Sequence, residues 1–280
     1  MKGNTDIPQG SPAEAPLNPE PAMLQLAEYV RMTVDQALDL FPKQENGRSC
    51  GTCWRATVDR AEKWLRMRAL FEGCPPRSQE GVLAALGTVS DMLQMSGKEL
   101  EFLMGCVVDK EPSTFLEIGR CTGYSAYAVL TAMSWKNGGG RCFVSVDRHK
   151  WKVTDDVIVG YAERCGIGRC DILVGDSREI DLSGAMGCRR IDACLIDGSH
   201  RFSVVESDVK RFGLASQWIL MHDCLPEENR GEAFRNWHIG PWRAVQKHGD
   251  ALHFSTRSGS LSLYENTKPE EGRVGNASVC

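Results

Sequence analysis

Two short clusters of the sequence combine carboxylates with imidazoles. Asp197 and His200 follow one apolar run, and His222 and Asp223 follow another. Carboxylate oxygens are good ligands for Mg²⁺, a hard cation that takes few protein groups and keeps several waters. An imidazole accepts a proton near neutral pH, and a bound cation lowers the pKa of a hydroxyl group. Residues of these types could therefore hold a cation and move a proton.

A third cluster is a glycine turn with an acid before it. Glu117 ends an apolar run two residues before Gly119, and Gly123 and Ser125 follow. Glycine lets the backbone approach a ligand closely, and the helix after the turn begins with free N–H groups. The dinucleotide fingerprint is absent, because G-x-x-x-G stands in place of G-x-G-x-x-G. An acid at this position disfavours a pyrophosphate and favours a cationic group, so the turn is typical of a site for a positively charged ligand.

The elements that position these clusters are short β-rich runs in the second half of the chain. The first five are separated by helix-length segments, which indicates a doubly wound α/β domain with a parallel sheet covered on both faces. The last two flank the turn-like residues 257–259, and we expect them to pair as an antiparallel hairpin at the sheet edge. The predicted strands are Thr114–Ile118, Cys142–Val146, Cys170–Val174, Ile191–Ile196, Trp218–Met221, Leu252–Ser255 and Leu261–Tyr264.

Helical periodicity precedes the strands. It predicts helices over residues 22–40, 54–72, 79–94 and 99–108. The resulting division of the chain is a disordered tail over 1–21, an N-terminal helical cap over 22–95, the α/β domain over 96–265 and a loose C-terminal tail over 266–280. The cap is expected either to cover the pocket as a lid or to form the interface of a homodimer, and the sequence leaves both open.

The order of the strand-end motifs resembles the class I S-adenosylmethionine-dependent methyltransferases, whose first motif is commonly E/D-x-G-x-x-x-G. The resemblance covers roughly residues 96–265 and implies a Rossmann-like domain that binds S-adenosylmethionine. It implies that Glu117, Gly119 and Gly123 line the pocket for the methionine part. The cofactor-binding residues on this hypothesis are Glu117, Gly119, Gly123, Ser125, Asp147, Asp176, Ser177 and Asp197.

Two of these assignments concern the nucleoside. Asp147 ends the second strand, where a carboxylate can accept both ribose hydroxyls, and a helix N-cap is its alternative role. Asp176 and Ser177 follow the third strand, in what looks like the family's adenine-contacting loop. Asp176 would accept from the adenine amino group, while Ser177 could instead cap a helix.

The motifs after the fourth and fifth strands resemble a subgroup of small-molecule and sugar O-methyltransferases, which includes cephalosporin-hydroxylase-like and macrolide sugar O-methyltransferase-like proteins. The resemblance implies that Asp197 and Asp223 hold Mg²⁺ and that His200 is the general base. Capping at strand ends is the alternative for both aspartates, and a loop histidine bound to a carboxylate is the alternative for His200. His222 stands where the subgroup often carries an acid, and it is open as a metal ligand, as an alternative catalytic base or as a partner of a ligand.

Composition restricts the partners. The chain has 280 residues and a formal net charge of -4, so no electrostatic feature favours nucleic acid. No apolar run is long enough for a membrane span, and no secretory signal precedes the domain, so we expect a soluble cytoplasmic protein. Twelve cysteines fit a reducing compartment. Cys50 and Cys53 have the spacing of a zinc half-site or a redox pair, with free thiols as the alternative.

Competing interpretations remain at this stage. The main hypothesis is methyl transfer to a small-molecule acceptor with a hydroxyl group, and the departure at His222 motivates a non-catalytic cofactor-binding or scaffold protein on the same fold. An NAD-linked oxidoreductase is disfavoured by the missing fingerprint. A relative of pathway hydroxylases is supported by association alone. Trp237 and Trp242 would either wall the acceptor pocket or pack a surface helix, and packing is favoured.

Overall fold

The computed structural model describes residues 65–89, 94–136, 140–150, 154–186, 190–226 and 239–268. Several predictions lie outside these residues: the tail over 1–21, the helix over 22–40, residues 54–64 of the next helix, the Cys50 and Cys53 pair, Trp237 and residues 269–280. Within the described ranges, no helix has both the length and the apolar character that a membrane crossing requires.

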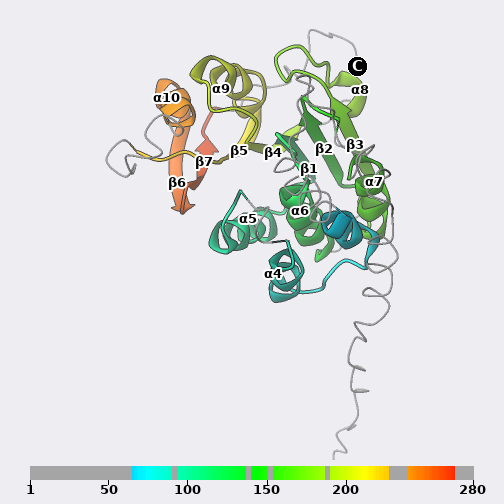
Figure 1. Ribbon diagram of the computed structural model, residues 1–280. Coiled ribbons are helices and arrows are strands. Elements are labelled where there is room, and N and C mark those ends of the chain that lie inside the picture. The colour runs from blue at the N-terminus through cyan, green and yellow to red at the C-terminus, as the bar shows by residue number, and fades with distance from the viewer. Residues whose placement is uncertain are drawn as a thin grey trace, which may run out of the picture.

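Seven strands form one sheet in the order β3-β2-β1-β4-β5-β7-β6 (Figure 1). β1 to β5 run parallel, β7 lies antiparallel to β5, and β6 lies antiparallel to β7. This arrangement confirms the predicted Rossmann-like, mostly parallel sheet with a C-terminal antiparallel hairpin. The strands are β1 (Thr114–Ile118), β2 (Cys142–Asp147), β3 (Arg169–Val174), β4 (Ile191–Ile196), β5 (Ser216–Met221), β6 (Leu252–Ser258) and β7 (Leu261–Asn266).

Helices cover both faces of the sheet, because successive strand side chains point to opposite sides. Phe115 packs into the core under α4 to α7, while Leu116 packs into the core under α8 to α10. The two groups of helices are seen on either side of the strands in Figure 1. The helices are α4 (Gln79–Gly87), α5 (Gly97–Lys110), α6 (Tyr124–Ser134), α7 (Asp155–Arg164), α8 (Ser183–Met186), α9 (Phe202–Asp208), the π-helix η2 (Val209–Gly213) and α10 (Ile239–Lys247).

Most predicted boundaries lie within two residues of the observed ones, and two differ by more. The helix predicted over 79–94 ends at Gly87, because Thr88 turns back and donates through its N–H and its hydroxyl to the Ala85 carbonyl. The hairpin turn was predicted at 257–259, but β6 continues to Ser258 and the turn lies at Gly259 and Ser260. Gly259 has φ +59, so the left-handed residue decides where the hairpin reverses.

Helix 65–72, the described part of the predicted helix 54–72, lies against α6 and α7. Phe71 is fully buried, and its ring meets Tyr127 and Tyr161 edge-on at centroid distances of 5.6 and 5.4 Å. Arg68 adds an ion pair with Asp156 at 2.8 Å. A Cβ atom on Gly123 would lie 3.1 Å from the Phe71 ring, so this helix abuts the glycine turn that starts α6.

Candidate active site

The glycine turn between β1 and α6 packs against the loop that follows β4. Gly119 has φ +95, and its N–H donates to the Val146 carbonyl at 2.8 Å. A Cβ atom on Gly119 would lie 2.5 Å from the Cα of Gly198 and would meet the Asp197 carbonyl. Only glycine combines this backbone conformation with so close an approach, so Gly119 allows the glycine turn to pack directly on the loop after β4.

Glu117 lies beneath this turn rather than on its surface. Its side chain is fully buried, and its two oxygens accept hydrogen bonds from Ser125 at 2.6 Å and Ser145 at 2.5 Å. Burial raises the pKa of Glu117 to about 7, although both serine hydroxyls and the charge of Arg120 oppose that rise. Ser125 is thereby placed as a partner of Glu117, and Ser145 is a site residue that sequence reasoning missed.

Arg120, which lies in the glycine turn, is another site residue that sequence reasoning missed. Its side chain is fully buried, and its Nε donates to Asp155 at 2.8 Å. Its Nη1 donates to the carbonyl and the hydroxyl of Ser145, both at 3.2 Å. A charged residue between two glycines is the only signal in the sequence, and that signal does not show that the guanidinium points inward.

Asp147 joins the end of β2 to the glycine turn. One carboxylate oxygen accepts from the Cys121 N–H and the other from the His149 N–H, each at 2.8 Å. The alternative as a helix N-cap is wrong, because α7 begins at Asp155 after Thr154. Each oxygen keeps a second lone pair, so the contact with ribose hydroxyls stays a prediction.

The predicted adenine loop lies at the end of β3. Asp176 accepts from the Arg178 guanidinium at 2.5 Å and from the Arg178 N–H at 3.0 Å. These hydrogen bonds hold the pKa of Asp176 well below its usual range. The carbonyl of Ser177 accepts from Arg211, and no helix begins at Ser177, since residues 177–179 form a turn. The adenine contact of this loop stays a prediction.

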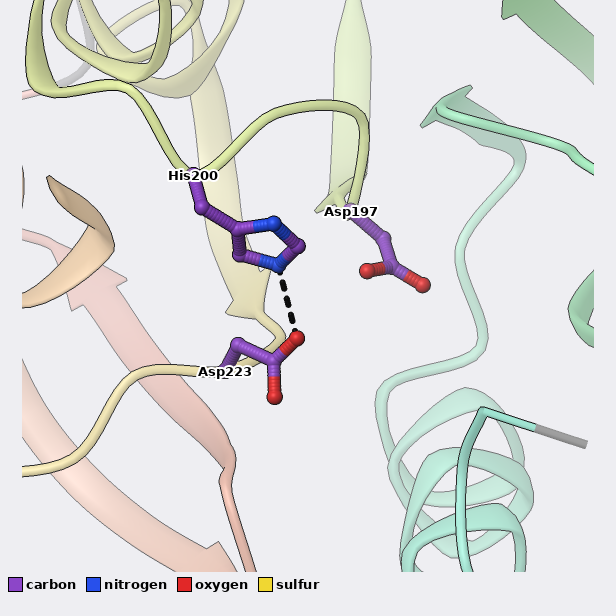
Figure 2. A group of neighbouring side chains, drawn as sticks. All are labelled: Asp197, His200 and Asp223. Carbon is purple, nitrogen blue, oxygen red and sulfur yellow. Dashed lines mark hydrogen bonds and ion pairs between the residues drawn. The ribbon is translucent and has the colours of Figure 1, made fainter. Parts of the chain in front are cut away.

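The acid and imidazole clusters after β4 and β5 do meet. The Asp197 N–H donates to the Ile118 carbonyl and the His222 N–H donates to the Ile196 carbonyl, which fixes both loops at the carboxyl edge of the sheet. Figure 2 shows Asp197, His200 and Asp223 converging, with His200 Nε2 2.7 Å from Asp223 Oδ2. One potential ligand atom from each of the three lies within 4.8 Å of the others. We call these three residues the reactive group.

His222 lies behind the reactive group. Its side chain is 2% exposed, and its Nδ1 is 2.9 Å from Asp197 Oδ1 and 3.5 Å from Asp223 Oδ2. Burial lowers the pKa of His222, but the charges of Asp197, Asp223 and Glu99 outweigh it and raise the pKa to about 9. Burial raises the pKa of Asp197 as well, although the facing His222 ring acts to lower it.

The two loops of the reactive group are held by elements that come late in the chain. A Cβ atom on Gly240 would collide with the His200 carbonyl, so the start of α10 packs directly on the backbone of that histidine. Asp223 has φ +52, an unusual conformation for a residue other than glycine. The Cys224 N–H donates to the Ser260 carbonyl at 2.9 Å, which ties this strained position to the β6–β7 turn.

The sheet and the helices on its two faces define an α/β protein of the doubly wound class. The chain is similar to an O-methyltransferase from Bacillus cereus in complex with SAH, with 16% identity, coverage of 67% of this chain and 90% of that chain, and a TM-score of 0.47. It is also similar to the calicheamicin methyltransferase CalS11, with 13% identity, coverage of 80% and 99%, and a TM-score of 0.49. A third similar structure is the SAH-bound Podospora anserina methyltransferase PaMTH1, with 15% identity, coverage of 80% of this chain and 100% of that chain, and a TM-score of 0.45.

At these identities and TM-scores the likeness assigns no activity to the chain. Neither a protein-family profile nor a curated protein sequence matches it. The function is therefore argued from the site itself.

Proposed function

We propose that this protein is an S-adenosylmethionine-dependent methyltransferase that acts on a hydroxyl group of a small molecule. The observation that carries the proposal is the packing of the Gly119 turn against the Asp197 loop, with His200 and Asp223 beside it. A donor site and a proton-accepting group thus meet at one edge of the sheet, where ligands of open α/β folds bind.

The residues of the first two motifs fit the cofactor. Gly123 starts α6 without a side-chain cap, so the N–H groups of the first turn are available to a carboxylate such as that of methionine. Asp147 has oxygen lone pairs for ribose hydroxyls. Carboxylates on three strand ends give the edge a negative potential that suits a sulfonium. When bound, S-adenosylmethionine supplies an electrophilic methyl group.

His200 is the proposed general base, and Asp223 is the residue that orients it. With Nε2–H donating to Asp223 Oδ2, the tautomer of His200 places the proton-accepting lone pair on Nδ1. The side chain of His200 is 23% exposed, so it can reach an acceptor that enters from solvent. His222 is placed differently, because its side chain is 2% exposed and its ring faces Asp197. We therefore assign His222 to positioning and charge balance.

Asp197 and Asp223 are the proposed ligands of a divalent cation. Two carboxylates and one imidazole whose ligand atoms lie within 4.8 Å of one another form a donor set that suits Mg²⁺ through its oxygens. When bound, the cation would lower the pKa of the acceptor hydroxyl. Asp197 shares one oxygen with His222, which leaves its other oxygen for the metal.

The acceptor is proposed to be a small molecule, and neither nucleic acid nor a membrane is proposed as a partner. The net charge of -4 gives no electrostatic reason to expect a polyanion as partner. The protein is proposed to be soluble and cytoplasmic, and to be present as a monomer or as a homodimer.

The decisive experiment measures binding and turnover separately. Calorimetry with S-adenosylhomocysteine should give a measurable heat for the wild-type protein, and a panel of sugars, catechols and other small hydroxyl compounds should reveal methyl transfer by mass spectrometry. His200→Ala should keep the affinity and lose about 10²- to 10⁴-fold in turnover, as expected for a general base. His253→Ala is the matched control, because His253 is exposed on β6, away from the reactive group.

The possible results are distinct. A wild-type protein that binds no S-adenosylhomocysteine contradicts the cofactor assignment, and tight binding of NAD would support an oxidoreductase. Binding without transfer across the panel would favour the scaffold alternative. Full activity in His200→Ala would contradict the assignment of His200 as the general base.

The cation is tested with Asp223→Asn. Asparagine tolerates the left-handed backbone of this position but is a weaker metal ligand, so the fold should be kept. Manganese binding, followed by electron paramagnetic resonance, should weaken in the variant, and EDTA should lower wild-type turnover. Equal turnover with EDTA and with Mg²⁺ would contradict a catalytic cation.

A further inference from the structure

Glu99 is a buried carboxylate near the reactive group that the sequence analysis did not single out. It stands in the first turn of α5, and only 6% of the residue is exposed. A buried charge without partners is costly, so its partners indicate its task. Glu99 divides its two oxygens between two different neighbourhoods.

One oxygen of Glu99 belongs to the helix. Oε2 accepts from the Ser96 N–H at 2.7 Å and from the Ser96 hydroxyl at 2.9 Å. Together with the hydrogen bond from the Glu99 N–H to Ser96, these contacts form a capping box, which stabilises the start of a helix. This half of the side chain has an ordinary structural role.

The other oxygen faces the proposed active site. Oε1 accepts from the Ser260 N–H at 2.7 Å and from the Ser260 hydroxyl at 2.8 Å. The same hydroxyl lies 3.4 Å from Asp223 Oδ1, and the Ser260 carbonyl accepts from the residue after Asp223. Glu99 therefore holds the β6–β7 turn in place, and this turn holds Asp223 in its left-handed conformation.

A second path leads from the same oxygen through His222. Glu99 Oε1 lies 3.9 Å from His222 Nε2, and the other ring nitrogen is bound to Asp197. Among the described residues, His222 Nε2 is buried and has no hydrogen-bond partner, so the Glu99 carboxylate is the charged group that this nitrogen faces. The ring thus lies between two carboxylates, one on α5 and one after β4.

We propose that Glu99 is a positioning residue for methyl transfer. It holds Asp223 in place through Ser260, and it holds Asp197 in place through His222. The inference rests on the proposed function, since it concerns the same site. It assigns to α5 and to the β6–β7 turn the task of fixing the reactive group. His200 then finds Asp223 at hydrogen-bond distance before any ligand binds.

The test compares Glu99→Gln with Ser96→Ala. The amide of glutamine has one accepting oxygen where the carboxylate has two, so it cannot serve Ser96 and Ser260 together. Ser96→Ala is the matched control, because it breaks the capping box on the Oε2 side and leaves the contacts of Oε1 in place. Both variants should lower the melting temperature. Glu99→Gln alone should lower kcat, by about 10- to 100-fold, with the acceptor KM and the S-adenosylhomocysteine affinity within about twofold of wild type.

A third variant and a spectroscopic signal complete the test. Ser260→Ala removes the hydroxyl between Glu99 and Asp223 and should lower kcat as Glu99→Gln does. The side-chain ¹⁵N signals of His222, assigned by their loss in His222→Asn, should shift in Glu99→Gln and stay in place in Ser96→Ala. This readout needs no substrate.

The contrary results are equally clear. A kcat in Glu99→Gln within twofold of wild type, or the same loss of kcat in Ser96→Ala, would overturn the proposal and leave Glu99 as a helix cap. Unchanged His222 signals in Glu99→Gln would overturn the path through His222. A wild-type protein without methyl transfer contradicts the proposed function instead, and the His222 signals then decide alone whether Glu99 acts on that ring.

Discussion

Replacement of Gly119 by alanine should separate two costs that this turn avoids. The first is conformational, because φ +95 is unfavourable for any residue with a Cβ atom, by about 1–2 kcal/mol. The second is steric, because the new Cβ would meet the backbone of Asp197 and Gly198, which cannot rotate away as a flexible side chain could. Overpacking of this kind costs about 1–3 kcal/mol. We therefore expect Gly119→Ala to lose about 2–5 kcal/mol in the free energy of unfolding.

Gly166→Ala is the matched control for the first cost. Gly166 also has a positive φ, +70, but no described atom lies within 4 Å of the Cβ position. Urea unfolding of both variants should show the larger loss for Gly119→Ala, with the difference arising from the collision with the Asp197 loop. Calorimetry should also show weaker binding of S-adenosylhomocysteine to Gly119→Ala alone. Equal losses of stability with equal affinity would refute the close packing between the first and fourth motifs.

Two further predictions concern the buried charges under the turn. Burial raises the pKa of Glu117 to about 7, so the folded state keeps a proton that the unfolded chain releases near 4.5. The free energy of unfolding should therefore fall by about 3 kcal/mol as pH rises between these two values. Urea unfolding of Glu117→Gln should show a smaller fall. Arg120→Met should cost about 3–5 kcal/mol in urea unfolding, because the buried Asp155 carboxylate loses the guanidinium that balances its charge. The exposed pair of Lys136 with Glu111 is the control, and Lys136→Met should leave the free energy of unfolding nearly unchanged.

The sequence predicted the sheet because its signals are local. The apolar runs of β4 and β5 are each followed by polar residues, and an α/β fold brings the carboxyl ends of parallel strands to one edge, so Asp197 and Asp223 could be expected to meet. The hairpin turn was predicted two residues early, because residues 257–259 resemble a turn while the left-handed residue is Gly259.

Contacts that depend on tertiary packing could not be predicted in the same way. No spacing rule relates Glu99 to Ser260, which lie 161 residues apart, or places His222 between Glu99 and Asp197. The inward direction of Arg120 depends on the position of Asp155 on another helix. The sequence thus predicted that the loops of Asp197 and Asp223 meet at the edge, but not which buried residues would hold them there.

The exposure of the charged side chains separates their tasks. Glu117 is fully buried and bound by serines, and the Asp197 side chain, 6% exposed, is bound by His222. Asp223 and His200 are 15% and 23% exposed, and they bind each other. On the proposed function, an acceptor entering from solvent would meet the last pair first, while the inner carboxylates already have partners that fix them. On the proposed function, proton transfer is therefore expected at His200, and the buried acids position the residues around it without taking part in the transfer.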